Sequence, residues 1–188
     1  MTPDCRVVEG WERERGAIST RICRWSSSCL CLSLLACQPA PGGLATEVEG
    51  VWERREVTRT QAGEVTTDTQ PGPSLYIFTE SHYSIVGMRA GEADARYATP
   101  WTPTDEEKLA RYGAVSVNAG TYEIGDGSLV VRPVVARVAD FVGGEARFEY
   151  QISGDTLWLT MVEEHSRDGV TATWVGTRSS RSKLVRIE

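Results

Sequence analysis

The chain has no cysteine after Cys37, although its first 37 residues contain all five of its cysteines. Only two histidines are present, and no His or Cys pair has the spacing of a metal site. Neither a Gly-x-Ser-x-Gly nucleophile motif nor a Gly-rich phosphate-binding loop occurs. We therefore expect no metal and no cofactor, and the motifs assign no catalytic residue.

Long apolar runs are also lacking. A transmembrane helix needs about 20 apolar residues, and the most apolar stretch of this chain, residues 25–36, has twelve positions that include four serines. This stretch follows Arg21 and Arg24 and ends in the small residue Ala36, an order that is typical of an export signal. We therefore expect residues 1–36 to be a signal peptide and to form a disordered leader.

The end of this leader has a second feature. The sequence Leu34-Leu35-Ala36-Cys37 resembles the lipobox of bacterial lipoproteins. That resemblance implies cleavage before Cys37, acylation of Cys37, and a protein that is tethered to a membrane of the bacterial cell envelope. Residues 38–46, rich in Pro, Gly and Ala, would then complete a tether that begins at Cys37. An ordinary secretory signal, with a secreted product, and an unstructured cytosolic tail are the alternatives.

The remaining part of the chain is acidic. After residue 36 it has 15 basic and 22 acidic residues, a net charge of −7, and its length suits one domain with a sizeable core. A domain of this charge without basic clusters is a poor nucleic-acid binder. The only basic run is near the C-terminus, and we interpret it as a solvated strand face rather than a phosphate or lipid-headgroup patch: Arg178, Arg181, Lys183 and Arg186.

Short β-rich runs separated by turn residues follow the tether, which favours an all-β barrel or sandwich. Gly125-Asp126-Gly127 is the strongest hairpin signal, because glycine tolerates positive φ. From Ala146 to Ile152, apolar and polar residues alternate as in a half-buried strand. Leu157 and Leu159 share a face of the next run, with Trp158 opposite. The eight expected strands are 51–59, 74–79, 82–88, 120–124, 128–138, 146–152, 156–162 and 170–177, the last of which could extend toward 187.

One helix interrupts these strands. Thr104 and Glu107 have the spacing of a capping box, and Leu109, Tyr112 and Val115 recur on one face. We expect this helix to cap one end of a barrel as a plug or lid. The preceding loop, 89–101, is expected to be either a lid over the barrel mouth or a surface excursion packed by its aromatic residues.

The order of these motifs resembles the bacterial lipocalin-like domain family, whose members are calycin-type barrels. Gly50-Val51-Trp52 matches the Gly-x-Trp signature, and 75–79, 82–85, 119–124 and 141–160 resemble later strands of that family. The resemblance covers residues 47–188 and implies an eight-stranded antiparallel barrel around a small apolar ligand. It also implies that Trp52 packs at the closed end beneath an arginine of the last strand, for which Arg178 is the first candidate and Arg186 the second.

The first strand departs from that family. If Trp52 points inward, regular alternation sends Arg54 and Glu56 inward too, where they would have to pair or meet a polar ligand. We favour a bulge that reverses the alternation, which would turn Val57 inward and both charges outward.

Three hypotheses on function remain. We favour a non-catalytic, envelope-tethered barrel that binds a small apolar or amphipathic molecule. A lyase, isomerase or cyclase that uses His82, Arg137 and tyrosines in the lumen is the second, and it rests on analogy of fold alone. A packed barrel that acts only as a structural or interaction module is the third. The candidate ligand-binding residues are Tyr76, His82, Tyr122, Arg137, Phe148, Tyr150 and Leu159, with rim or surface positions as the alternative for the polar ones among them.

Overall fold

The computed structural model describes residues 45–125 and 127–188. Our predictions of a signal peptide at 1–36, lipidation at Cys37 and a tether over 37–46 lie outside the described residues, apart from the last two tether positions, which begin α1. Within them, no helix is long and apolar enough to cross a membrane.

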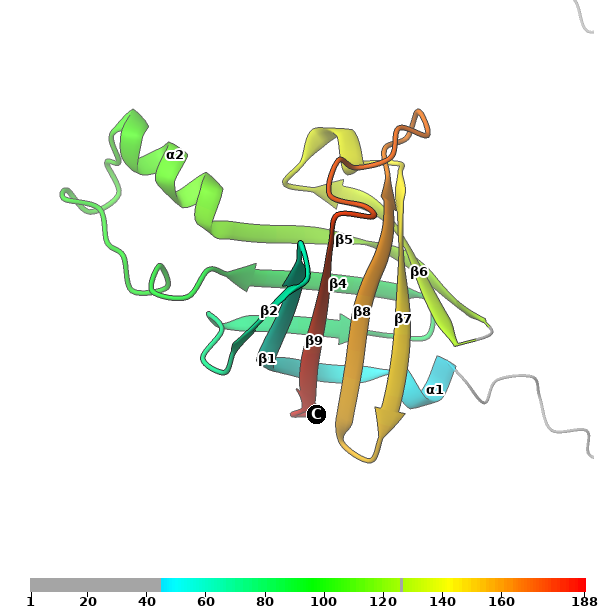
Figure 1. The fold of residues 1–188 in the computed structure, drawn as a ribbon. Coiled ribbons are helices and arrows are strands. Elements are labelled where there is room, and N and C mark those ends of the chain that lie inside the picture. Colours follow the sequence, from blue (N-terminus) through cyan, green and yellow to red (C-terminus); the bar gives the residue numbers. More distant parts are fainter. Residues whose placement is uncertain (1–44, 126) are drawn as a thin grey trace, which may run out of the picture. The chain divides into compact units, whose positions relative to one another are not determined.

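The described residues form nine strands, two α-helices and one short 3-10 helix (Figure 1). In chain order these elements are α1 (Ala45–Val48), β1 (Gly50–Gln61), β2 (Glu64–Asp68), β3 (Ser74–Phe78), β4 (His82–Met88), α2 (Asp105–Ala114), β5 (Val115–Gly125), β6 (Ser128–Ala136), η1 (Ala139–Phe141), β7 (Glu145–Ser153), β8 (Thr156–His165) and β9 (Arg178–Arg186).

Eight of these strands close into an antiparallel barrel, as predicted. Neighbours along the chain pair from β3 to β9, and β9 pairs with β1 to complete the circle. The extra strand, β2, forms a hairpin with the second half of β1, whereas the first four residues of β1 pair with β3. The tight turn of that hairpin uses Ala62 and Gly63, both at positive φ. On one edge, β1 therefore pairs first with β3 and then with β2, while its other edge pairs with β9.

Two strand predictions need correction. Residues 170–177 form turns with one isolated bridge, and the last strand is β9 at Arg178–Arg186. The apolar pattern of 170–177 misled the prediction, because closure of the barrel against both β1 and β8 holds a largely polar segment as a strand. Strand β2 and the first part of β5 were not predicted at all.

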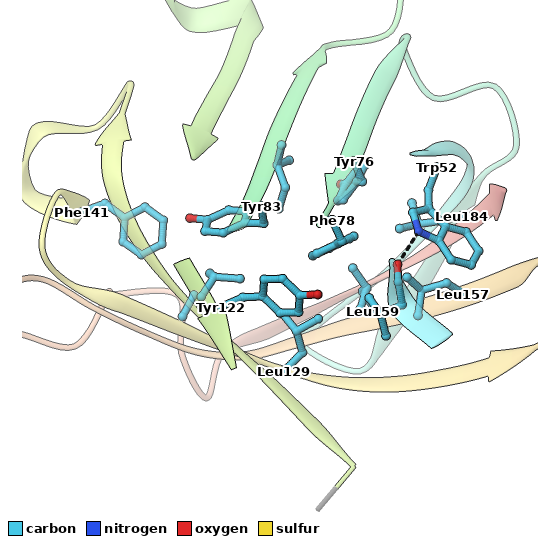
Figure 2. Close-up of a cluster of buried hydrophobic side chains, with 14 residues drawn as sticks. Trp52, Tyr76, Phe78, Tyr83, Tyr122, Leu129, Phe141, Leu157, Leu159 and Leu184 are labelled. Atoms are coloured by element: carbon cyan, nitrogen blue, oxygen red, sulfur yellow. Dashed lines mark hydrogen bonds between the residues drawn. The ribbon is translucent and has the colours of Figure 1, made fainter. Parts of the chain in front are cut away.

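The interior is packed with apolar and aromatic side chains from every barrel strand (Figure 2). The alternation predicted in β7 is confirmed, since Ala146 and Phe148 lie opposite inward residues of β6 and Tyr150 lies opposite Leu159 of β8. Trp158 points outward as predicted, and its ring is covered by the Arg181 guanidinium at 5.7 Å. Arg181 thereby shields part of this large outward side chain from water.

A short helix does cap one end of the barrel, but it is α1 and not the predicted α2. Val48 of α1 is fully buried and its carbonyl accepts a hydrogen bond from Trp52 Nε1 at 2.8 Å. The capping box of α2 is present as predicted, yet Leu109 and Tyr112 are 72% and 54% exposed. Helix α2 is therefore no plug, and we call the end beneath α1 the closed end.

The arginine that packs on Trp52 is Arg186, our second candidate. Its guanidinium carbon lies 4.1 Å from the Trp52 ring centroid, because Arg186 and Trp52 are direct cross-strand partners. Arg178, our first candidate, lies instead over Trp174 and pairs with Gln61 at the far end of β1. The correction follows from the shift of the last strand, since Arg178 begins β9 and Arg186 ends it.

Candidate ligand site at the open end of the barrel

The two ends of the barrel differ in how the strands are connected. At the closed end the chain turns sharply between β3 and β4, β5 and β6, and β7 and β8. At the other end, which we call the open end, the connections are longer, and they comprise residues 69–73, 89–114, 137–144 and 166–177. Because long loops on a rigid scaffold carry most binding sites, the open end is where a ligand site is expected.

The larger cavity at the open end, cavity 1, has a volume of about 760 Å³. It lies between the β6–β7 and β8–β9 connections, and its apolar lining comes from Val138, Phe141, Val170, Ala172 and Trp174. Phe141 belongs at the same time to the packed interior, and Figure 2 shows the Tyr83 hydroxyl pointing toward its ring. A cavity of this size fits the range of small-molecule sites.

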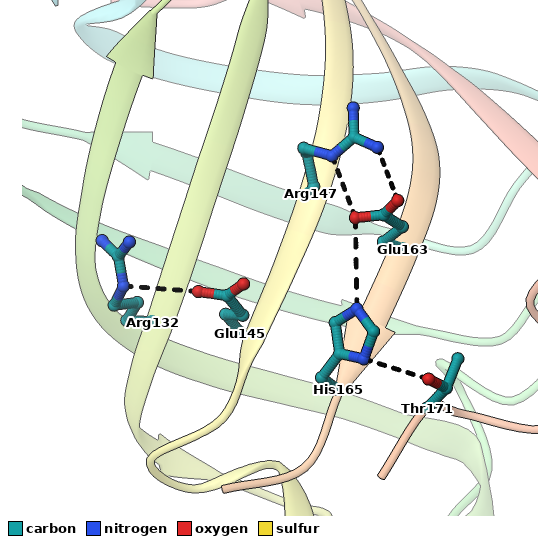
Figure 3. Close-up of polar contacts among 6 residues, drawn as sticks. All are labelled: Arg132, Glu145, Arg147, Glu163, His165 and Thr171. Atoms are coloured by element: carbon teal, nitrogen blue, oxygen red, sulfur yellow. Dashed lines mark hydrogen bonds and ion pairs between the residues drawn. The ribbon is translucent and has the colours of Figure 1, made fainter. Parts of the chain in front are cut away.

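Polar contacts hold the β8–β9 loop over cavity 1. Trp174 Nε1 donates a hydrogen bond to Glu164 Oε2 at 2.5 Å, and the Thr171 hydroxyl contacts His165 Nδ1 at 3.2 Å. Figure 3 shows the neighbouring outer surface, where Arg147 Nε and Nη2 donate to the two carboxylate oxygens of Glu163 at 3.1 and 2.6 Å. These bonds lower the pKa of the Glu163 carboxyl. Cavity 1 thus has a mixed lining, in which the apolar and aromatic residues lie beside polar and charged ones: Asp140, Glu164, His165, Ser166, Arg167, Asp168, Thr171 and Thr173.

A second cavity of about 400 Å³ opens where β1 leaves β3. We call it the arginine pocket, because Arg54, Arg59 and Arg89 line it together with a single acidic residue, Asp68. The loop before β3 contributes Pro71 and Gly72, and the end of β4 contributes Met88 and Ala90. Gly72 lies so close to the Met88 carbonyl that a β-carbon there would clash, so the loop crosses β4 tightly.

The predicted bulge in β1 is present, but it does not turn both charged residues outward. The register with β9 shifts between Arg54 and Glu56, which turns Val57 inward and leaves it 2% exposed. Arg54 precedes the shift and lies opposite the fully buried Leu184, so it stays on the inner face. The prediction that both charges turn outward is therefore wrong for Arg54.

Four buried polar atoms on the inner face have no hydrogen-bond partner within the described residues. They are Arg54 Nε, Ser74 Oγ, Tyr83 Oη and Asn118 Oδ1, and they come from β1, β3, β4 and β5, which are consecutive around the barrel. Burial raises the pKa of the Tyr83 hydroxyl. Since nearly all buried polar groups in proteins are paired, four orphans on one wall call for a water or a ligand group.

Five of the predicted ligand-binding residues lie on the inner face. Tyr76, Tyr122 and Leu159 are buried in the core, and Phe148 and Tyr150 pack against it while partly exposed. The Tyr122 hydroxyl donates to the Thr79 carbonyl at 2.6 Å, and burial, with a smaller contribution from Glu49, raises the pKa of Tyr122 to about 12. These positions are compatible with a ligand, but their role in binding stays a prediction.

The other two predicted residues do not line the interior. His82 is exposed on the outer face of β4 at the closed end, where its Nδ1 contacts the Ser81 hydroxyl at 2.9 Å. Arg137 lies beyond the end of β6, where Nη1 donates to the Tyr112 carbonyl and the guanidinium stacks on the Tyr112 ring. The constellation of His, Tyr and Arg that the enzyme hypothesis requires is therefore not assembled.

The loop before α2 is a surface excursion, as one of our two predictions had it, but it is neither packed by Trp101 nor a lid. Trp101 is 96% exposed, so it neither packs the loop nor covers the mouth. The loop is held to α2 instead, through a 2.7 Å hydrogen bond from the Ala98 amide to Glu107 Oε1.

No group of three or more potential metal ligands occurs within residues 45–125 and 127–188.

Sequence reasoning missed several residues of the open end, among them Ser74, Asn118, Phe141 and Trp174. Only Arg54 could be recognised from the sequence, because strand alternation places this charged residue on the same inner face as Trp52.

Comparison with known proteins adds no identification, because no family model matches the chain and no curated protein is significantly similar to it.

Proposed function

We propose that this protein is a lipocalin-like binding protein that takes up a small amphipathic molecule at the open end of its barrel. The observation that carries this proposal is the difference between the two ends. The closed end is sealed by α1, Trp52 and Arg186, whereas the open end has two cavities, of about 760 and 400 Å³. A sealed base beneath a hollowed mouth is the arrangement that small-molecule barrels use.

The chemistry of the two cavities supports an amphipathic rather than a purely apolar ligand. Cavity 1 offers the Phe141 and Trp174 rings beside polar and charged side chains, and the arginine pocket offers guanidinium groups. The proposal includes tethering of the barrel to the bacterial cell envelope through an acylated Cys37, which the lipobox-like sequence supports.

A packed interaction module is the second candidate, and the dense packing of side chains toward the closed end of the barrel favours it. Trp52, Leu129, Leu157 and Leu184 are all fully buried and fill the interior near and above the closed end. If such packing continued through the mouth, the barrel would have no room for a ligand.

Displacement of a fluorescent probe separates these candidates. The full-length chain is titrated with 1-anilinonaphthalene-8-sulfonate, and the bound probe is then competed with alkyl amphiphiles of increasing length. Ala172→Trp, which fills cavity 1, is expected to weaken probe binding at least tenfold. Ala95→Trp, at an exposed position of the loop before α2, is the matched control and should bind normally. Absence of probe binding, or equal binding by both variants, would contradict the proposal.

A further inference from the structure

We propose that the arginine pocket binds the carboxylate of the amphipathic ligand, with the Arg54 guanidinium as its direct partner. This inference deepens the proposed function and rests on it, because it assigns the charge and the binding place of the ligand's polar end.

The first support is the geometry around Arg54. Arg54 Nη2 makes only a 3.5 Å hydrogen bond to the Gly72 carbonyl, and its Nε is buried without a partner within the described part of the chain. A β-carbon built on Gly87 would lie 3.8 Å from Arg54 Nη2 and 3.0 Å from Ser74 Cβ. The guanidinium and the Ser74 side chain thus flank the bare backbone of Gly87 on the inner face.

The second support is the state of Ser74. Its side chain is among the most buried polar groups, at 6% exposure, and its Oγ has no partner among residues 45–125 and 127–188. The pairing of β1 with β3 ends at Glu53 and Leu75, so Arg54 and Ser74 are the next residues along the two strands. Ser74 also pairs with Gly87 of β4. A second polar group with unused hydrogen-bonding capacity therefore lies on the strand next to Arg54, although Ser74 is not among the residues that line the arginine pocket.

The third support is the charge of the pocket. Three arginines and one aspartate line it, which leaves an excess of two positive charges in a protein whose net charge is −6. No carboxylate of the described residues forms an ion pair with Arg54, Arg59 or Arg89. The Asp68 carboxylate instead accepts a hydrogen bond from the Gln70 amide. An anion in the pocket would supply the missing countercharge.

The number of donors favours a carboxylate over a phosphate monoester. A carboxylate has two oxygens, and a guanidinium edge binds both in parallel. A phosphate dianion presents three oxygens and more charge, and Asp68 in the same pocket would repel it more strongly. A neutral headgroup would leave the guanidinium without a countercharge.

Three ligands with the same alkyl chain test the inference: decanoate, decanol and decyl phosphate, each titrated calorimetrically into the full-length chain. We expect decanoate to bind the unmodified protein at least tenfold more tightly than decanol, and at least as tightly as decyl phosphate. In Arg54→Met the preference for decanoate over decanol should fall to within about twofold. Arg55→Met removes a neighbouring arginine that projects outward and pairs with Glu53 at 2.7 Å, and this control should keep the full preference.

The outcomes distinguish this inference from the proposed function. Equal binding of decanoate and decanol would overturn the carboxylate site but leave the binding function intact, whereas failure of all three ligands would overturn both. Stronger binding of decyl phosphate than of decanoate would overturn the choice of carboxylate. If Arg54→Met does not fold, as judged by circular dichroism, Arg59→Met is used instead, and an unreduced preference in that variant would count against the pocket.

Discussion

The Arg186 guanidinium lies 4.1 Å above the ring of the buried Trp52 and joins the last strand to the first. The same guanidinium donates to the carbonyls of Glu47, at 2.8 Å, and of Glu49, so it also holds α1 against the barrel. Gly50 makes this approach possible, because it is at positive φ and a β-carbon there would collide with Arg186. Arg186, Trp52 and Gly50 form one unit that seals the closed end.

This unit predicts a large loss of stability in Arg186→Met. The substitution removes a cation–π contact and two charge-assisted hydrogen bonds, and we expect it to lower the free energy of unfolding by about 2–4 kcal/mol. Urea denaturation measures the change. Arg96→Met, at an exposed position of the loop before α2, is the control and should change stability by less than about 0.5 kcal/mol. Equal effects of the two variants would show that Arg186 has no special role.

The packed interior predicts a cost for truncating Leu157. This side chain is fully buried, and Leu157→Ala should destabilise the protein by about 2–5 kcal/mol because it leaves a cavity. Leu75→Ala provides the comparison, since Leu75 is 44% exposed on the outer face of β3 and its truncation should cost about 1 kcal/mol or less. A cost below about 1 kcal/mol for Leu157→Ala would mean that the barrel is not packed at that level.

The orphaned hydroxyl of Ser74 predicts an unusual gain. In ligand-free protein, Ser74→Ala removes a buried group without a partner and should leave the free energy of unfolding equal or raise it by about 1 kcal/mol. Ser84→Ala, on the outer face of β4, is the matched control. If Ser74→Ala instead destabilised the protein by more than about 1 kcal/mol, the hydroxyl would have a bound partner even without ligand.

The buried tyrosines predict a loss of stability at alkaline pH. Burial raises the pKa of Tyr122 to about 12, against about 10 in an unfolded chain, and raises that of Tyr83 as well. Because the folded-state pKa is raised, this contribution is fully present below about pH 10 and is lost as the pH rises toward 12. Denaturant unfolding between pH 8 and pH 12 measures the loss, and Tyr122→Phe should reduce it. A flat profile would contradict the burial of these phenols.

The sequence predicted the barrel well where period-2 alternation and turn residues agree. Residues 146–152 alternate cleanly, and β7 lies there almost to the residue. Residues 178–186 could not be found in this way, because only Leu184 among them is fully buried and the strand exists through its pairing with two neighbours. Helix α2 shows the opposite error, since its capping box predicted the helix correctly while its apolar face faces water.

The candidate site was less accessible to sequence reasoning, for physical reasons. Arg54 stood out as a charge at an inward parity, but the position of the bulge decides whether it faces in or out, and no residue type marks a bulge reliably. Cavity 1 is formed by two connections that meet only in the folded barrel, the one with Phe141 and the one with Trp174. His82 was chosen for its chemistry, and strand parity places it outside.

The central claim is that a small amphipathic molecule binds at the open end while the closed end stays sealed. Backbone amide chemical shifts, recorded while 1-anilinonaphthalene-8-sulfonate is added to the isotope-labelled protein, test this claim most directly. We predict that the shifted amides concentrate in residues 69–73, 137–144 and 166–177 and that the turns at 79–81 and 153–155 stay unchanged. Shifts confined to the closed end, or no shifts at saturating probe, would contradict the account.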